Sequence, residues 1–543
     1  MCFEIRERDL LARIGRLKTK SGSIETPVLF PVINPAVQPI PPKEMAEKFG
    51  CNALITNAYI IRKHYGEKAI KQGIHRLLGF DGVIMTDSGA YQILVYGDIE
   101  VKPEEIIDYQ EKIGTDIAVI LDIPTGWNVS RKYAEETVKE TLARAEALWK
   151  IKSRNDILWV GPVQGGKFLD LISKSAKEIG KLPFEIHALG SPTPVMEQYQ
   201  FDMLVDMIMA AKMNLPLERP LHLFGAGHPF MFSLAIALGC DMFDSAAYAI
   251  YARENRYMTE YGTFRLEELE WLPCSCPVCV KHTAKELRDM PKNEREKLLA
   301  EHNLHVCFGE LRRIRQAIIE GRLWEYLELR CHSHPALLKA LKRLGKYADY
   351  LERHSPITKE SGLFYFSHLD LARPEVVRHR RKILNDYSPP ENAKILVLLP
   401  QTKEKPFHRA REQKRFRKII KEKLGDETGR MHVCTYAAPF GIVPDEIDEV
   451  YPLSQHEVAI PLDTETIKYV AEQVASYIRQ TSYEMVFLLE NIEDWKGYIE
   501  KSCRNVCERK GIKLFTIKVE KWDKAAAEDF ANYISEILRK RDD

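Results

Sequence analysis

The sequence predicts an α/β protein that consists of a (β/α)8 TIM barrel, a cysteine-rich segment that completes it, and a C-terminal α/β region. Short β-branched runs alternate with amphipathic helical patterns through residues 27–245. Strand-then-helix units in this arrangement fit a barrel of about 250 residues. A doubly wound open sheet is the alternative, but no glycine-rich dinucleotide fingerprint follows the first strand.

The predicted barrel strands share β-branched and apolar residues bounded by polar or glycine-containing turns. They are Pro27–Val32, Ala53–Thr56, Val83–Thr86, Ile117–Leu121, Leu158–Val163, Glu185–Leu189, Leu221–Phe224 and Asp241–Phe243. Amphipathic helices are expected over Pro103–Ile113, Arg131–Lys152, Met196–Met213 and Pro229–Leu238. Further along, Lys394–Leu399 is predicted to open another α/β unit, and Lys524–Arg541 is predicted to be a helix.

Changes of pattern along the chain divide it into four expected segments. Residues 1–257 form the barrel core, 258–335 a metal-binding subdomain that completes it, 336–390 a basic connector, and 391–543 a C-terminal α/β domain that contacts RNA. The sequence Ser388-Pro389-Pro390-Glu391-Asn392 is typical of a linker or a sharp turn.

Composition excludes several classes of protein. The chain has 79 Lys and Arg against 78 Asp and Glu, so nucleic-acid binding would have to come from local patches. No apolar run approaches the ~20 residues that a membrane-spanning helix needs. The start, Met1–Arg8, is too charged for a signal peptide, and the 11 cysteines do not form a disulfide framework. We therefore expect a cytoplasmic protein that does not enter a membrane.

Three cysteines cluster in the pattern C-x-C-x-x-C, at Cys274, Cys276 and Cys279. Thiolates this close can converge on one tetrahedral zinc ion, which needs a fourth ligand. The segment 301–305 offers His302 and His305, between which spacing alone does not decide. His282 is a less favoured third choice. A site of three cysteines and one histidine leaves no open position and would be structural.

Polar residues follow many of the predicted strands, where barrel enzymes place their chemistry. Examples are Asn57, Asp87, Asp122, Gln164 and Asp244. A single aspartate at such a position is usually a helix cap, but several strand ends carry polar groups here. Asp87 and Asp244 could flank the anomeric carbon of a sugar, one as nucleophile and the other as proton donor and acceptor. Asp122 could accept hydrogen bonds from a guanine-type edge, and the Gln164 amide could donate to a carbonyl.

Taken together, these motifs resemble the tRNA-guanine transglycosylase family over roughly residues 10–335. The residues that carry the resemblance are Gly15–Leu17, Ile24–Pro27, Thr56–Tyr59, Thr86–Gln92, Val163–Gly166, Asp241–Asp244 and the cysteine cluster with its distant histidine. Asp244–Ala249 and the segments Ala438–Pro444 and Val450–Gln455 are similar to the archaeal, archaeosine-forming branch.

The resemblance implies a base exchange at position 15 of the tRNA D-loop, where 7-cyano-7-deazaguanine replaces guanine. By analogy Asp244 is the nucleophile and Asp87 the general acid and base, and the opposite assignment is the alternative. The implied base-binding residues are Ser88, Asp122, Gln164, Gly190 and Ser191. The implied ligands of one structural Zn2+ are Cys274, Cys276, Cys279 and His302. No nucleotide or redox cofactor is implied, and the family is often dimeric.

Departures from the family raise two further questions. The longer archaeal members end in a small β-barrel RNA-binding module of the PUA type, which the sequence does not indicate here. Either a separate subunit supplies it, or the tRNA is held differently. Archaeosine synthase shares the architecture, but its motif cysteine is replaced here by Gln401, and Ala410 and Gln413 stand where a serine and a histidine are expected.

Three rival functions remain beside the transglycosylase. A non-catalytic RNA-binding subunit would not need both Asp87 and Asp244. Archaeosine synthase chemistry is disfavoured by Gln401. A small-molecule glycosidase on the same barrel would not need a basic C-terminal half.

Two basic segments are candidates for RNA contact. Residues 403–423 hold ten Lys and Arg and three Glu, a local charge of +7, with Phe407 and Phe416 interleaved. Arg378–Lys382 is the second candidate. A solvated helix is the ordinary interpretation of the longer segment, and a phosphate-tracking patch is the functional one.

Overall fold

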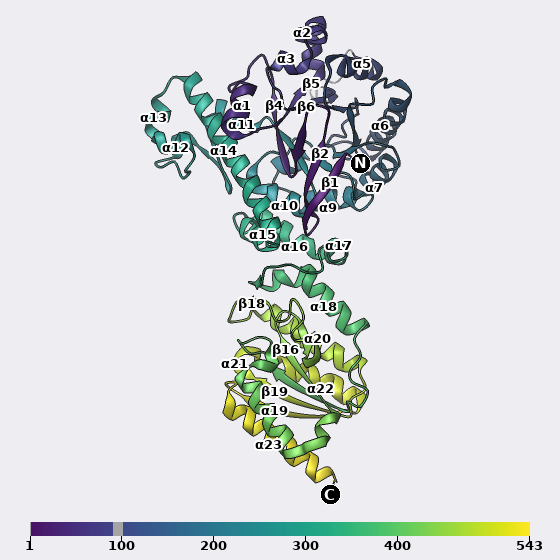
Figure 1. Cartoon of the computed structure of the whole chain (residues 1–543), viewed down its shortest axis with the longest axis vertical. Coiled ribbons are helices and arrows are strands. Elements are labelled where there is room, and N and C mark those ends of the chain that lie inside the picture. Colours follow the sequence, from purple (N-terminus) through teal and green to yellow (C-terminus); the bar gives the residue numbers. More distant parts are fainter. Residues whose placement is uncertain (1, 91–100, 543) are drawn as a thin grey trace. The chain divides into compact units, whose positions relative to one another are not determined.

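The computed structural model describes residues 2–90 and 101–542. The chain divides into two compact units, Met1–Leu344 and Gly345–Asp543 (Figure 1). The first contains the barrel and the cysteine cluster, and the second contains a separate sheet covered by helices.

Eight parallel strands close into a barrel in the order β10-β11-β4-β5-β6-β7-β8-β9. They are β4 (Val28–Ile33), β5 (Ala53–Asn57), β6 (Val83–Asp87), β7 (Ile117–Val119), β8 (Leu158–Val163), β9 (Ile186–Leu189), β10 (Leu221–Leu223) and β11 (Met242–Ser245). Every strand predicted for the barrel is confirmed, with its ends within two residues. The (β/α)8 prediction is therefore confirmed, and the open-sheet alternative is wrong.

Helices follow the strands and form the outer layer of the barrel. They are α1 (Pro42–Phe49), α2 (Ala58–Gln72), α3 (Ile74–Leu78), α5 (Pro103–Ile113), α6 (Arg131–Ile151), α7 (Leu169–Ile179), α8 (Thr193–Glu197), α9 (Phe201–Lys212), α10 (Phe232–Ala237) and α11 (Ala247–Arg253). Local chemistry sets several ends. The Ser130 side chain caps the start of α6, and Gly114 ends α5 at a φ of 75°.

A three-stranded antiparallel sheet precedes the barrel and was not predicted from the sequence. It consists of β1 (Phe3–Asp9), β2 (Ala12–Lys18) and β3 (Ser23–Glu25). Phe3, Leu17 and Ile24 join the apolar cluster that fills the barrel, together with residues at the starts of its strands. Arg13 on β2 also forms a buried ion pair with Asp241, its Nε lying 3.0 Å from Oδ1.

The cysteine-rich segment is built on a hairpin and a long helix. It contains β12 (Arg256–Thr259), β13 (Gly262–Arg265), α12 (Pro277–Lys281), α13 (Ala284–Asp289) and α14 (Lys292–Ile319), followed by α15 (Leu323–Cys331) and α16 (Pro335–Arg343). Asn303 of α14 accepts a hydrogen bond of 2.9 Å from the backbone amide of Met258, which ties the helix to the hairpin. Helix α14 also packs along α11 of the barrel.

The second unit is a three-layer α/β/α domain. Its mixed sheet has the order β17-β16-β15-β19-β20, from β15 (Ile395–Pro400), β16 (Met431–Ala437), β17 (Gly441–Pro444), β19 (Met485–Asn491) and β20 (Lys513–Val519). A short parallel pair, β14 (Leu363–Tyr365) and β18 (His456–Val458), stands apart from it. The helices are α17 (Ala348–His354), α18 (Pro374–Asn385), α19 (Arg411–Leu424), α20 (Thr464–Gln480), α21 (Ile492–Trp495), α22 (Tyr498–Lys510) and α23 (Lys524–Asp542).

Alternation along β15 explains the three layers. Ile395, Val397 and Leu399 pack against α19 and α23, whereas Leu396 and Leu398 pack against α20 and α22. A strand that is apolar on both faces is expected where helices cover both sides of a parallel sheet. The prediction of a C-terminal α/β region is confirmed, as are the strand near residue 394 and the final helix.

Two interpretations of the basic segments need correction. Phe407 and Phe416 are buried in the cores of the second unit, so neither is free to stack on a base. Arg378 donates to the buried carboxylate of Glu352 at 2.9 Å, and Arg381 pairs with the same group. Arg378 and His379 are therefore buried and stabilise the fold, whereas Arg381 and Lys382 remain exposed.

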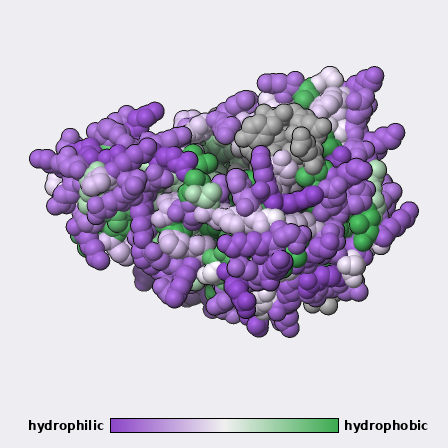
Figure 2. Space-filling model, turned by 90° about the horizontal axis from the view of Figure 1, so that it is seen from above, coloured by the Kyte–Doolittle hydropathy of each residue, from purple (hydrophilic) through white to green (hydrophobic). Residues whose placement is uncertain are grey.

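No helix among the described residues is long and apolar enough to cross a membrane. The face seen from above in Figure 2 is mostly hydrophilic, and its hydrophobic residues form small separate patches.

Candidate active site and metal centre

The cysteine cluster and His302 form one compact group. Their ligand atoms all lie within 4.8 Å of one another. Cys276 Sγ is 3.5 Å from Cys279 Sγ, and His302 Nδ1 is 3.3 Å from Cys279 Sγ. A tetrahedral zinc ion with Zn–S bonds of about 2.3 Å would separate its sulfur ligands by about 3.8 Å, so the spacing fits.

His302 is presented to the cluster by its surroundings. Its Nε2 lies 2.8 Å from the carbonyl oxygen of Met258, which leaves Nδ1 facing the three sulfurs. Tyr257 stacks on the ring with a centroid separation of 3.7 Å. A metal-ligating histidine commonly donates its other nitrogen to a carbonyl in this way. His305 instead packs edge-on against Phe49, and the described group does not include His282.

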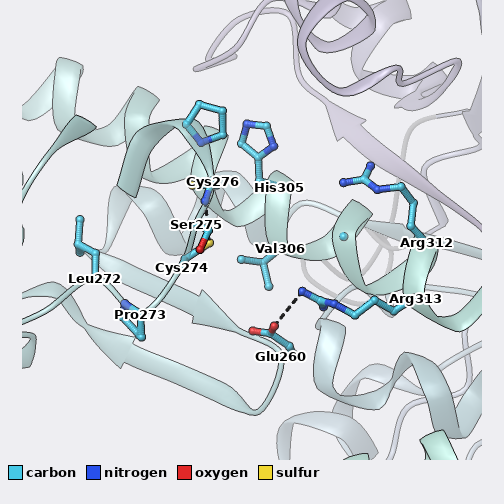
Figure 3. Close-up of a pocket in the computed structure, with 12 residues that line it drawn as sticks. Glu260, Leu272, Pro273, Cys274, Ser275, Cys276, His305, Val306, Arg312 and Arg313 are labelled. Carbon is cyan, nitrogen blue, oxygen red and sulfur yellow. Dashed lines mark hydrogen bonds and ion pairs between the residues drawn. The ribbon is translucent and has the colours of Figure 1, made fainter. Parts of the chain in front are cut away.

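A cavity of about 690 Å3 opens beside the cysteine cluster (Figure 3). It lies along α14, with Glu260 and Arg313 in an ion pair of 3.0 Å across one side and Arg312 and His305 on its wall. Its lining includes neither Asp87 nor Asp244, so its size does not make it the active site.

The carboxyl ends of the barrel strands bring the predicted carboxylates together. Asp87 lies at the end of β6 and accepts a hydrogen bond of 3.2 Å from Asn57, its partner in register at the end of β5. Loss of water around the Asp87 carboxyl, followed by the nearby charges of Asp122 and Asp244, raises its pKa to about 7. The backbone amides of Ser88 and Gly89 offset part of this shift.

Asp122 and Gln164 form a bonded pair inside the mouth. Gln164 Nε2 donates to Asp122 Oδ2 at 2.6 Å, and both side chains are buried. Burial raises the pKa of Asp122 to about 6, although the bond from Gln164 opposes the shift. The other end of the Gln164 amide is also fixed, because its Oε1 accepts from the Thr125 amide at 3.0 Å and from Ser191 Oγ at 3.2 Å.

Gly190 and Ser191 complete this wall of the mouth. A Cβ atom at Gly190 would lie 2.2 Å from Gln164 Nε2, so the position requires glycine. Ser191 adopts a φ of 59°, which is uncommon outside glycine and places its hydroxyl on Gln164. The Ser88 hydroxyl, next to Asp87, is fully buried and has no hydrogen-bond partner among the described residues.

Asp244 was predicted to follow its strand directly, but β11 extends to Ser245 and therefore includes it. Its Oδ1 accepts a hydrogen bond of 2.9 Å from the Gly225 amide and lies 2.9 Å from His222 Nε2. The side chain is 15% exposed, so it remains open to the mouth.

Sequence reasoning missed some residues of the mouth. His222 lies inside the predicted strand Leu221–Phe224, and a histidine within an apolar strand pattern does not by itself indicate a functional role. Thr125, which helps to hold Gln164, was also missed. Tyr91 and Gln92 of the Thr86–Gln92 motif lie outside the described residues.

The fold and the site define a class. A (β/α)8 barrel carries carboxylates in contrasting environments at its mouth, with a Cys3His metal centre beside the barrel. Paired carboxylates of this kind are typical of enzymes that break and form glycosidic bonds.

Comparisons with known proteins are specific. The family model described as queuine tRNA-ribosyltransferase matches residues 9–336, and a domain of unknown function (DUF5591) matches residues 376–536. The chain is 46% identical over 474 residues to a tRNA-guanine(15) transglycosylase of Methanocaldococcus jannaschii, covering 86% of this chain and 70% of that protein. It is 46% identical over 462 residues to the tRNA-guanine(15) transglycosylase of Pyrobaculum aerophilum, covering 84% and 90%.

The chain belongs to the tRNA-guanine transglycosylase family, a family of pentosyltransferases, and its relatives named here are archaeal.

Proposed function

We propose that this chain is a tRNA-guanine(15) transglycosylase that exchanges guanine for 7-cyano-7-deazaguanine through a covalent aspartyl–ribose intermediate. The names of its relatives support the position of the guanine. The resemblance to the archaeosine-forming branch supports the identity of the incoming base.

The contrast between Asp87 and Asp244 is the observation that carries this proposal. Burial and neighbouring charges raise the pKa of Asp87 to about 7, so it can hold a proton near neutrality. Asp244 instead has His222 Nε2 and the Gly225 amide within hydrogen-bond distance of one oxygen and is partly open to the mouth. Two carboxylates with such different environments suit an acid and a nucleophile. This supports Asp244 as the nucleophile over the opposite assignment.

Each half-reaction then balances. A lone pair of Asp244 forms a bond to C1′ of the ribose, the C1′–N9 bond breaks, and its electron pair leaves with guanine. Asp87 gives its proton to the departing base, which leaves neutral. The incoming base then loses its N9 proton to Asp87, and its nitrogen attacks C1′ and displaces the Asp244 carboxylate.

The base would lie against the wall that the Asp122–Gln164 pair forms with Gly190 and Ser191. Asp122 would accept from the N–H edge of guanine, while the second N–H of the Gln164 amide would donate to a base oxygen. The Ser88 hydroxyl, which has no partner in the described part of the chain, would add a further contact. The close approach of backbone at Gly190 and Ser191 suits a planar ligand.

The metal centre supplies structure and no chemistry in this scheme. Cys274, Cys276, Cys279 and His302 would hold one Zn2+ per chain and leave no coordination position open. Because one N-glycosidic bond replaces another, the reaction needs no nucleotide or redox cofactor.

The proposed reaction also defines the substrates of the protein. The substrates are tRNA, gripped in part by the C-terminal unit, and the free deazaguanine base. A separate RNA-binding subunit of the PUA type, a homodimer and a cytoplasmic location belong to the same proposal.

Archaeosine synthase chemistry is less favoured because its motif positions are engaged elsewhere. Gln401 Oε1 accepts from the Ala438 amide at 2.9 Å, and Gln413 donates to the Thr435 hydroxyl at 2.8 Å. Both side chains stabilise the second unit.

The test is the incubation of an unmodified tRNA transcript with 7-cyano-7-deazaguanine, followed by nuclease digestion and mass spectrometry. The proposal predicts one deazaguanine per tRNA, at position 15. A chain that binds the tRNA tightly yet replaces no base, even when cell extract supplies a partner, would instead be the non-catalytic subunit.

A further inference from the structure

Both hydrogen bonds to Asp244 fall on the same oxygen. His222 Nε2 and the Gly225 amide each lie 2.9 Å from Oδ1. Neither bond involves Oδ2, although the side chain is partly open to the mouth. The two oxygens of this carboxylate therefore differ in how many of their lone pairs are available.

The surroundings of His222 make its bond directional. The imidazole is fully buried on β10, with Phe30 and Phe224 at centroid distances of 6.0 and 4.7 Å. Its Nδ1 has no hydrogen-bond partner among the described residues. A proton on Nδ1 would be buried and unpaired, so the hydrogen-bonding pattern assigns the ring hydrogen to Nε2, where it is donated to Asp244.

The backbone fixes the second donor equally firmly. Gly225 has a φ of 65°, and a Cβ atom there would lie 2.6 Å from the Thr193 hydroxyl. Glycine therefore allows the chain to turn after β10 and to aim its amide at Asp244. In the parallel ladder, His222 is in register with Met242, two residues before Asp244, which puts both donors on one side of the carboxylate.

We propose that His222 is a positioning residue: with the Gly225 amide it immobilises Oδ1 of Asp244, so that Oδ2 is the oxygen that attacks C1′. The inference rests on the proposed role of Asp244 as nucleophile. During attack, the Oδ2 lone pair forms the bond to C1′ as the base leaves with the electron pair of the C1′–N9 bond. Oδ1 becomes the carbonyl oxygen of the ester and keeps both donors.

The same two bonds assist the second half-reaction. When the incoming base attacks C1′, the C1′–Oδ2 bond breaks and its electron pair returns to the carboxylate. Donors on Oδ1 stabilise that returning charge because they are already in place. His222 thus orients the nucleophile in one step and stabilises the leaving group in the other, without exchanging a proton.

The experiment compares His222→Phe, which has no donor, with His222→Gln, whose side-chain amide can reach Oδ1. His187→Phe is the matched control, because His187 is a buried histidine on the neighbouring strand β9 whose Nε2 has no partner within residues 2–90 and 101–542. Each variant is assayed for guanine exchange, for the rate at which the covalent tRNA adduct forms, and for its melting temperature.

A charge-assisted hydrogen bond of this kind predicts that His222→Phe lowers kcat and the rate of adduct formation by about 10- to 100-fold. The KM for tRNA should stay within about threefold, since no tRNA contact is lost. His222→Gln should recover the rate to within about threefold of the wild type, and His187→Phe should exchange guanine normally.

Two results would overturn the inference: a His222→Phe rate within twofold of the wild type, or His222→Gln as slow as His222→Phe. If His222→Phe does not fold, the Gln variant alone decides, because a rate far below the wild type in a folded protein contradicts the proposal. Asp244→Ala distinguishes a failure of the His222 inference from a failure of the proposed nucleophile. An adduct that still forms without Asp244 refutes the proposed nucleophile itself, whatever the His222 variants do.

Discussion

Gln164 donates a hydrogen bond of 2.6 Å to the Asp122 carboxylate within the barrel mouth. Because Thr125 and Ser191 hold the other end of the same amide, the pair is set before any base arrives. Groups that are already ordered can bind the edge of a ligand without the entropy cost of fixing their side chains on binding.

Asp122→Asn should therefore weaken base recognition while it leaves tRNA binding intact. The asparagine oxygen can still accept from Gln164, but the amide cannot accept two N–H groups from guanine. A site with mismatched buried polar groups should raise the KM for free guanine by about 10- to 100-fold. Initial rates against guanine concentration measure this, and an unchanged KM would remove Asp122 from the base site.

Gly190→Ala should disturb the same pair from the other side. The added Cβ would lie 2.2 Å from Gln164 Nε2 and would push the amide off Asp122. We expect exchange to fall by at least about tenfold, and destabilisation of about 1–3 kcal/mol from the crowding. Gly22→Ala is the control, because nothing lies within 4 Å of a Cβ there. Equal activity of the two variants in a guanine exchange assay would contradict the account.

Asp87 should make both activity and stability depend on pH. Its pKa of about 7 in the folded protein lies above the ordinary 3.8, so the protein loses stability as pH rises between these values. Asp87→Asn removes this loss, since the amide does not ionise. The variant should be inactive, and its melting temperature should exceed that of the wild type by an amount that grows from pH 4 to pH 7 and then levels off.

Thermal melts of both proteins across that pH range measure the difference. A difference that is constant with pH would show that Asp87 titrates normally. In the wild type, kcat/KM should fall above about pH 7, because the acid that protonates the leaving base loses its proton.

His302→Ala should abolish zinc binding, whereas His305→Ala should preserve it. Of the histidines that the structure describes, only His302 joins the three sulfurs, and His305 packs on Phe49. Loss of a structural ligand should release the ion and lower the melting temperature, as a strong chelator does in the wild type. Metal content per chain by mass spectrometry gives the readout. Zinc retained at one per chain in His302→Ala would require a different ligand set.

Exposed lysines on α19 should contribute to the salt dependence of tRNA binding. Lys414, Lys418 and Lys421 are exposed, while the opposite face of the helix packs on the sheet. If each contacts a phosphate, replacing all three by Gln should lower the slope of log affinity against log salt by about 2–3.

The control replaces three exposed lysines of α6, Lys132, Lys139 and Lys150, in the same way. An equal change in slope for both triple variants would mean that α19 acts only through overall charge.

The barrel could be predicted because the apolar and β-branched pattern of each strand is local to that strand. β8, for example, keeps its β-branched and apolar run from Leu158 to Val163, and its end delivers Gln164 to the mouth. Asp87 likewise lies at the end of its strand, whereas Asp122 lies beyond the end of β7 and Asp244 lies within β11.

Features that depend on distant partners were not predictable. Strand β1 runs through the exposed charges Arg6, Glu7 and Arg8, which do not read as a strand without its partner β2. Arg13 meets Asp241 across more than two hundred residues of chain. Phe416 lies among basic residues in the sequence, but α19 packs it into the core of the second unit.

The most direct test of the central claim is guanine exchange by the purified chain. Unmodified tRNA transcript and radiolabelled guanine are incubated with the wild type, with Asp244→Ala, and with a transcript in which position 15 is not guanine. The account predicts label in tRNA only for the wild type acting on the unchanged transcript. Label that persists in Asp244→Ala, or in the transcript without guanine 15, would contradict it.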